Sequence, residues 1–304
     1  MYNDNSIYLR VFMINKTIHI ITLFLVLLIP VPAFSLGDYH FHRNIDQGNT
    51  GLVLITSSSK IKNLYTFFNK RKLLGKNIYF SKNKYIYRIL VPTSPLTKTG
   101  QYTLNIFFNN KKQKQLKIII NKSSFKKTII QIPKKKKGLL RSPGLNKEAA
   151  LIGAKFKEHS DTPYWRNQFI LPVKGRLTST YGNQRTYNNG IVTWWHKGID
   201  IGSKLGTAIV APNDGTISLT ATTFEVHGNT VMIDHGHGVV SVFNHMQSIK
   251  VKAGQFIQKG QKIGTVGSTG LSTGPHVHWG LSVNNIRVNP LQWVENRFAP
   301  NYFK

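Results

Sequence analysis

Short strand-like runs separated by turn residues dominate this 304-residue chain from about residue 48 onward. Runs such as GLVLITS, QYTLNIFFNN and KQLKIIINK are rich in β-branched and aromatic residues, and Asn, Lys, Gly and Ser separate them. Such residues favour strands, and short strands at regular spacing with no helical period are typical of all-β domains. From Phe169 onward the turns become richer in glycine, as in AIVAPNDGTISLT and KAGQFIQKGQKIGTVGSTG. The sequence therefore predicts an all-β fold in two parts.

The change in turn composition divides the chain into domains. Residues 36–133 are predicted to form a small β-sandwich, and residues 166–304 a compact, glycine-rich antiparallel β domain. Between them, KKKKGLLRSPG combines a charge run with Pro and Gly, which is typical of a linker. The segment from Leu145 to His159 has helix formers with apolar residues at helical spacing, and Asn146 is its expected N-cap. Residues 134–165 are therefore predicted to be a basic linker with a short helix.

The first 35 residues have the pattern of an export signal. Lys16 precedes an apolar run at residues 18–28, and the small residues of Ala33-Phe34-Ser35 follow it. We expect cleavage after Ser35. A buried helix or an uncleaved anchor is the alternative, but the run is short for a membrane span of ~20 residues and two prolines break it. Met13 is an alternative start of translation. The sequence thus predicts an exported protein of the periplasm or cell envelope.

The charge is strongly basic and unevenly spread. The chain has 41 Lys and Arg against 11 Asp and Glu, a formal net charge of +30, and the stretch from Gln47 to Lys147 has 23 basic residues and no acidic one. This predicts attraction to polyanions. For an exported protein we expect the basic domain to contact anionic envelope polymer or a membrane surface, and we expect no nucleic acid partner. A Lys-, Asn- and Ile-rich composition without a selected basic surface is the alternative.

Four histidines and one aspartate gather in three motifs of the C-terminal part. WWHKGID contains His196 and Asp200, SVFNHMQ contains His245, and GPHVHWG contains His276 and His278. Because the chain has no cysteine, any metal must be held by His, Asp or Glu, and disulfides and thiol nucleophiles are excluded. Side chains alternate along a strand, so the last two histidines project from one face. Catalytic zinc typically has three ligands of these types and one open position. The residues alone leave open which histidine is the third ligand.

The motifs HKGIDI, FNHM and GPHVHWGL are preceded by LTSTYGNQR and spaced by GTAIVAPNDGTI and KGQKIGTVGSTG. Together they resemble the lysostaphin and LytM-type zinc metallopeptidases, which cut peptide bonds in bacterial peptidoglycan. The resemblance implies Zn²⁺ ligands at His196, Asp200 and His278. It further implies that His245 and His276 are the catalytic pair, which positions water and stabilises the transition state.

The resemblance covers about residues 169–290 and implies a zinc endopeptidase that acts on peptidoglycan. A D,D cross-link between stem peptides is the expected bond, while glycine bridges or other amide bonds stay open. The alternative is a non-catalytic LytM-like regulator that activates another cell-wall hydrolase. Such members have lost ligands, whereas all five positions are filled here. In the basic domain, TKTGQYTLNIFFNN resembles more loosely the Ig-like modules that precede such peptidase domains.

The remaining histidines of the C-terminal part are expected to serve the fold, whereas two uses stay open for the tryptophans. His235 and His237 in MIDHGHGVV are flanked by glycines, which favours a hairpin, and His227 in FEVHGNT is expected to be a loop residue. Tryptophan packs in cores and also lines binding grooves, so both uses stay open for Trp194, Trp195 and Trp279.

Overall fold

The computed structural model describes residues 36–81, 83–165, 168–188, 190, 192–295 and 298. The expected export signal at residues 1–35 lies outside the described residues. Over the described ranges the chain is mostly β, as the sequence predicts. No helix in these ranges is long and apolar enough to cross a membrane.

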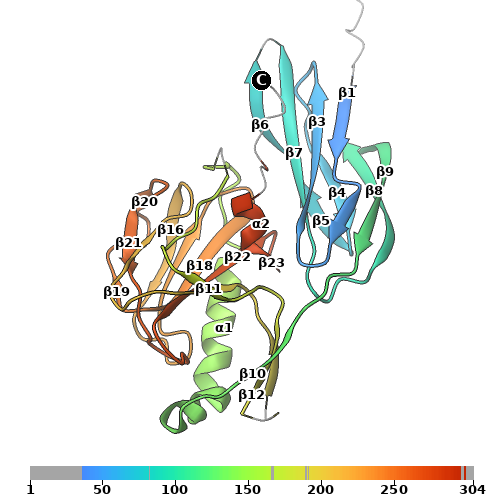
Figure 1. Ribbon diagram of the computed structural model, residues 1–304. Coiled ribbons are helices and arrows are strands. Elements are labelled where there is room, and N and C mark those ends of the chain that lie inside the picture. The colour runs from blue at the N-terminus through green and yellow to red at the C-terminus, as the bar shows by residue number, and fades with distance from the viewer. Residues whose placement is uncertain are drawn as a thin grey trace, which may run out of the picture. The chain divides into compact units, whose positions relative to one another are not determined.

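The N-terminal part is a sandwich of two β-sheets (Figure 1). The first sheet has the order β1 (Leu36–Phe41), β3 (Thr50–Ser57), β7 (Lys84–Pro92) and β6 (Lys76–Ser81). The second has the order β2 (Asn44–Asp46), β9 (Lys111–Asn121), β8 (Gly100–Phe108), β4 (Tyr65–Phe68) and β5 (Arg71–Leu74). Apolar side chains of both sheets, such as Ile55, Ile89 and Leu104, form one core. The predicted sandwich is thus observed, whereas its likeness to Ig-like modules stays a prediction.

Strands β3 and β7 are buried on both faces. Val53 and Ile55 of β3 belong to the sandwich core, while Leu52 and Leu54 on its opposite face pack into the core of the C-terminal part. Alternate residues of a strand face opposite sides of its sheet, so a strand between two cores must be apolar throughout. This explains why GLVLITS is a continuous apolar run with no polar alternation.

The C-terminal part is built on an antiparallel sheet that positions the candidate site. Its order is β11 (Arg176–Ser179), β14 (Ile199–Gly202), β22 (His276–Val283), β18 (Val239–Met246), β17 (Asn229–Asp234), β16 (Gly215–Ala221) and β20 (Phe256–Ile257), and β23 (Ile286–Val288) pairs with β22. A second sheet consists of β15 (Ala208–Val210), β21 (Lys262–Thr265) and β19 (Ser248–Ile249). Helix α2 (Pro290–Glu295) follows β23. The predicted antiparallel, glycine-rich domain is therefore confirmed.

The linker is ordered and contains two helices, η1 (Lys134–Arg141) and α1 (Pro143–Lys155). The N-cap of α1 is Ser142, whose hydroxyl accepts a hydrogen bond from the backbone N–H of Gly144 at 3.0 Å. The predicted N-cap Asn146 and the predicted end at His159 are wrong. Proline directly after a serine is a favourable first helical position, so the helix begins one turn earlier than the apolar spacing indicates.

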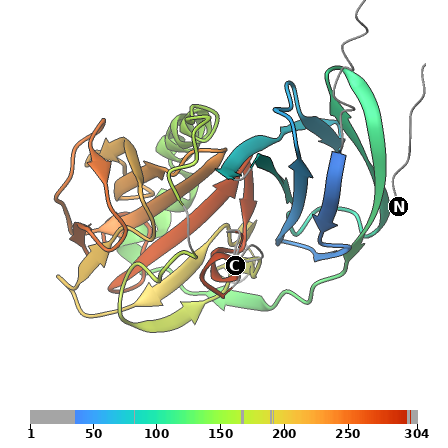
Figure 2. The same ribbon diagram turned by 90° about the horizontal axis from the view of Figure 1, so that it is seen from above.

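Helix α1 packs on one face of the C-terminal sheet, where Figure 2 shows it nearly end-on in light green. Ile152 of the helix and Phe156, the residue at its C-cap, pack with Met232, Val240 and Val242. The opposite face of the sheet packs against the core shared with β3 and β7. The sheet is therefore covered on both sides.

Strand β10 (Lys127–Ile130) joins a different sheet from the one its sequence suggested. The segment FKKTIIQIP resembles the sandwich strands in composition, but β10 pairs in parallel with β12 (Gln184–Tyr187), which in turn pairs with β13 (Val192–Trp195). The chain after the sandwich therefore contacts the strands that lead into the WWHKGID motif.

Candidate metal centre and active site

Neighbouring strands bring together the residues predicted as metal ligands. Asp200 on β14 lies directly opposite His278 on β22, and Gly202 lies opposite His276. His196 follows β13 and precedes β14, four residues before Asp200. The alternation of β22 places its two histidines on one face, as the spacing predicts.

Three of these side chains converge on one point. His196 Nε2 lies 3.0 Å from Asp200 Oδ1, His278 Nδ1 lies 2.9 Å from the same oxygen, and the two nitrogens are 3.0 Å apart. The ligand atoms of this group all lie within 4.8 Å of one another, as a metal site requires. His196 Nδ1 donates to the carbonyl of Thr180 at 2.8 Å, which fixes the ring with Nε2 toward the group.

The protonation states of this group suit metal binding. Burial lowers the pKa of His196, and burial lowers the pKa of His278 to about 3, so both imidazoles are neutral at pH 7. Burial alone would raise the pKa of Asp200, but the charge of the two histidines where they are protonated, together with their hydrogen bonds, outweighs it and holds that pKa well below its usual value. Neutral imidazoles and an ionised carboxylate are the forms that coordinate a metal.

Arg185 on β12 lies next to the candidate metal ligands, and the sequence did not single it out. Its guanidinium forms an ion pair with Asp200 Oδ2 and donates to the hydroxyl of Ser179 at 2.8 Å. One carboxylate oxygen therefore faces the histidines, and the other is occupied by Arg185. The only sequence signal was its place in the turn motif LTSTYGNQR.

His245 and His276 form a second pair beside the three converging residues. Their ring centroids are 5.0 Å apart, and the His245 ring is 6.5 Å from that of His278. His245 Nδ1 donates to the carbonyl of Thr269 at 2.8 Å, and His276 Nδ1 donates to the carbonyl of Gly274 at 2.8 Å. Because each Nδ1 is a donor, each Nε2 is left as an acceptor in the neutral ring.

The environment of His245 favours a neutral, proton-accepting ring. Burial is the largest cause that lowers its pKa well below the usual value, and the neighbouring His276 and His278 lower it further. His276 Nε2 lies 4.0 Å from Asp200 Oδ1, outside the tight group of three. His245 also has a left-handed backbone with φ of 64°, which is uncommon for residues other than glycine.

Comparison with known proteins agrees with this arrangement. Residues 195–290 match peptidase family M23. This part of the chain is an M23 domain. The chain is 34% identical over 125 residues to the peptidoglycan DD-endopeptidase ShyA of Vibrio cholerae, covering 41% of this chain and 29% of that protein. It is 32% identical over 126 residues to the murein hydrolase activator NlpD of Escherichia coli, covering 41% and 31%. The chain thus spans less than a third of the length of these curated relatives.

A solved structure shows the same fold over most of the chain. It is named as a peptidase M23 from Pseudomonas aeruginosa, and it superimposes with a TM-score of 0.60 at 24% identity. The superposition covers 80% of this chain and 92% of that one. Because the match extends well beyond the 96 residues of the M23 domain, it includes much of the N-terminal part as well.

The other histidines of the M23 domain lie apart from the group of three. His235 is fully buried, where its Nδ1 donates to the carbonyl of Asp214 at 2.7 Å and its Nε2 accepts from Ser241 at 2.9 Å. His237 contacts Arg88 of the sandwich. Both positions agree with the structural roles predicted for them.

The tryptophans of the M23 domain pack against other side chains. Trp279 is fully buried and stacks on Phe243. The half-buried Trp195 contacts Phe125, and Trp194 contacts Tyr187. Trp279 therefore packs in the core, which is one of the two uses that the sequence left open.

His227 has a more specific environment than a loop residue needs. It lies in the loop before β17, and its Nδ1 is 2.7 Å from Oε2 of Glu148 on α1. Its backbone carbonyl accepts a hydrogen bond from the N–H of His245 at 3.0 Å. Glu148 is therefore linked through one loop to the catalytic candidate, which no sequence pattern indicated.

Proposed function

We propose that this chain is a zinc-dependent endopeptidase that hydrolyses peptide cross-links of bacterial peptidoglycan. The observation that carries the proposal is the separation of the five motif residues into two groups. His196, Asp200 and His278 converge as ligands, while His245 and His276 lie beside them with hydrogen-bonded Nδ1 atoms. The ShyA relative, named as a DD-endopeptidase, supports a D,D cross-link as the bond.

The three converging residues suit zinc, because two neutral imidazoles and one carboxylate are its common ligands in catalytic sites. When bound, zinc supplies a Lewis acid that polarises the peptide carbonyl and makes water more acidic. Asp200 contributes one oxygen to this site, and Arg185 holds the other.

His245 and His276 provide the proton transfers and the stabilisation of charge. An Nε2 acceptor on a neutral imidazole can take the proton of the attacking water and return it to the leaving amine. The protonated ring then donates a hydrogen bond to the oxyanion that develops on the substrate carbonyl. We assign these two roles to the pair without dividing them between its members.

A non-catalytic regulator is the second candidate, because NlpD is named as a murein hydrolase activator and is also similar to this chain. The presence of all five residues favours the enzyme. A regulator needs neither the imidazole pair nor a carboxylate held in place by Arg185.

The proposal also includes where the protein is located and what its basic domain contacts there. We infer that residues 1–35 direct export to the periplasm or cell envelope. The basic sandwich then faces anionic envelope polymer or a membrane surface, and nucleic acid is not a partner.

Digestion of purified peptidoglycan sacculi by the zinc-loaded protein tests this function. We expect cross-linked muropeptides to fall to monomers, as identified by mass spectrometry, and His278→Ala to abolish the conversion. His276→Ala is expected to keep bound zinc and lose turnover. If the zinc-loaded protein cuts nothing but stimulates a purified wall hydrolase, the regulator replaces the enzyme.

A further inference from the structure

The face of the sheet that carries the metal centre continues toward helix α1. His276, His278 and Gly280 alternate on one face of β22, and Val242 of β18 lies directly opposite Gly280. Val242 contacts α1 through the cluster around Ile152 and Phe156. The helix therefore covers the same face of the sheet, a short distance beyond the metal centre.

Arg287 on β23 lies on this face between the metal centre and the helix. A Cβ atom built on Gly280 would lie 1.7 Å from Arg287 Nη2, so the guanidinium rests directly on that glycine. Its Cζ lies 4.8 Å from the centre of the Phe156 ring. Gly280, two residues after His278, has no side chain and so leaves room for the Arg287 guanidinium. Any other residue at this position would clash with it.

The backbone beside the metal centre holds Arg287 in place. Lys197 directly follows the ligand candidate His196, and its carbonyl accepts hydrogen bonds from Arg287 Nε at 3.0 Å and Nη2 at 2.7 Å. Among the described residues, Arg287 Nη1 has no hydrogen-bond partner, and Arg287 forms no ion pair with a carboxylate.

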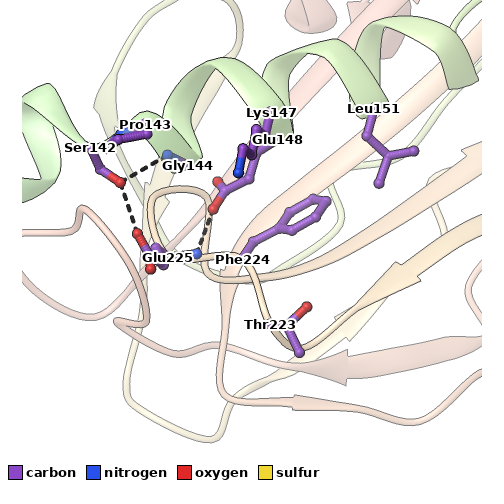
Figure 3. Close-up of a pocket in the computed structure, with 9 residues that line it drawn as sticks. All are labelled: Ser142, Pro143, Gly144, Lys147, Glu148, Leu151, Thr223, Phe224 and Glu225. Atoms are coloured by element: carbon purple, nitrogen blue, oxygen red, sulfur yellow. Dashed lines mark hydrogen bonds between the residues drawn. The ribbon is translucent and has the colours of Figure 1, made fainter.

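The nearby carboxylates are already occupied. Asp200 faces the two histidines and Arg185. Glu148 accepts hydrogen bonds from the N–H groups of Val226 and His227 and from the His227 ring. Figure 3 shows Glu148 pointing from α1 to the loop at Glu225. Neither of these two carboxylates is thus left to neutralise Arg287.

Arg287 therefore presents Nη1 without a protein partner, among the described residues, on the face of the sheet that carries the metal centre. A partly buried guanidinium without a counter-ion is costly unless an anion binds to it, and its planar donors fit a carboxylate.

We propose that Arg287 forms a carboxylate-binding subsite next to the metal centre, which binds a free carboxylate of the substrate peptide close to the bond that is cut. The inference rests on the proposed peptidase function and names a chemical requirement of its substrate. The ligand is a peptide carboxylate, and a carboxamide at the same position loses the charge that the subsite binds.

The test compares two cross-linked stem-peptide dimers that differ only in having free carboxylates or carboxamides beside the scissile bond. A charge-assisted pair contributes about 1.5–3 kcal/mol, which corresponds to a roughly 10–100-fold preference in kcat/KM for the free carboxylate. Arg287→Gln is expected to lower kcat/KM for the carboxylate dimer about 10–100-fold more than for the carboxamide dimer. Arg287→Lys should retain part of the preference, because it keeps the charge and loses the two-pronged donor.

Lys262→Gln, which removes an exposed lysine of β21, is the matched control and should keep the wild-type preference. Zinc content and thermal unfolding of each variant show whether the site is intact. If wild type hydrolyses both dimers equally, or if Arg287→Gln slows both by the same factor, the subsite is wrong and Arg287 is only structural.

Binding measured by calorimetry separates this inference from the proposed function. If wild type cuts neither dimer yet binds the carboxylate form at least tenfold more tightly, and Arg287→Gln removes the difference, the peptidase proposal fails and the subsite stands. Equal affinity for both dimers overturns the subsite whether or not cleavage occurs.

Discussion

Asp200 makes more of the interactions at the candidate metal centre than any other side chain described there. Its Oδ1 approaches both candidate ligand histidines, and its Oδ2 is held by Arg185, which also donates to Ser179. A carboxylate held on one side presents its other oxygen in a fixed direction. Metal affinity at this centre should therefore depend on a residue that does not touch the metal.

Replacement of Arg185 by Gln tests this dependence. We expect zinc affinity to fall about 10–100-fold, because Asp200 loses its orienting partner. Competition with a chromogenic chelator measures the affinity, and Lys262→Gln serves as the exposed control. Unchanged affinity in Arg185→Gln would show that the two histidines alone orient the carboxylate.

Buried histidines make the fold sensitive to acid. Burial lowers the pKa of His235 to about 4, against an ordinary value of 6.5 in the unfolded chain. The unfolded state therefore binds the proton first as the pH falls. The free energy of unfolding is therefore unaffected by the protonation of this histidine above about pH 6.5. It falls by about 3 kcal/mol between pH 6.5 and 4, because the unfolded chain takes up the proton that buried His235 does not.

Urea unfolding at a series of pH values checks this expectation. His235→Asn should be less stable at pH 7 and should lose about 3 kcal/mol less than wild type on acidification to pH 4. His40→Gln removes an exposed histidine of β1 and should keep the wild-type dependence. Parallel pH curves for His235→Asn and wild type would contradict the assignment.

The candidate site residues could be predicted from the sequence because their motifs are local. His276 and His278 share a face through strand alternation, and His196 and Asp200 are four residues apart. Arg185 could not be found in this way, because it lies 15 residues from Asp200 and only strand pairing brings it close. Glu148 lies 79 residues from His227, in a segment whose composition indicates only a helix.

At the scale of elements, helix α1 holds the loop next to the catalytic candidates. Glu148 is buried and accepts hydrogen bonds from the backbone N–H groups of residues 225–227 as well as from the His227 ring. The carbonyl of His227 in turn accepts from His245. The linker helix therefore supports the loop beside the candidate active site.

Glu148→Ala is expected to lower the free energy of unfolding by about 2–4 kcal/mol, because it leaves several buried donors without an acceptor. Glu148→Gln keeps one acceptor oxygen and should cost about half as much. Denaturant unfolding measures both variants. Glu158→Gln, which breaks an exposed pair with Lys155, is the matched control and should cost less than about 0.5 kcal/mol. If Glu148→Ala lowers the free energy of unfolding as little as the control does, water replaces the carboxylate as the acceptor.

The strands could be predicted from composition, but their partners could not. Alternation identifies a strand with one exposed face, whereas the continuous apolar run of β3 becomes understandable only when a core is found on each side. β10 has the composition of a sandwich strand and pairs with β12. The start of α1 depends on Ser142 and the proline after it, which the apolar spacing does not reveal.

At the scale of the whole molecule, the sandwich and the M23 domain share side-chain contacts. Arg88 on β7 is buried, where it contacts His237 Nδ1 at 3.2 Å, donates to the carbonyl of Phe298 at 3.2 Å and stacks over Trp165 at 3.6 Å. The backbone of Thr50 exchanges two hydrogen bonds with the buried side chain of Gln292 on α2. Contacts of this kind predict that the two parts unfold together.

The tryptophans make this cooperativity measurable, because all five lie at residue 165 or later. Leu104 is fully buried in the sandwich core alone, so Leu104→Ala should cost about 2–5 kcal/mol through the cavity it creates. If the shared core couples the two parts, tryptophan fluorescence and far-UV circular dichroism will shift to the same lower denaturant midpoint. Leu96→Ala, at a residue 72% exposed, should shift neither signal. A Leu104→Ala protein whose circular dichroism shifts while its fluorescence midpoint stays in place would show that the M23 domain is stable without the sandwich.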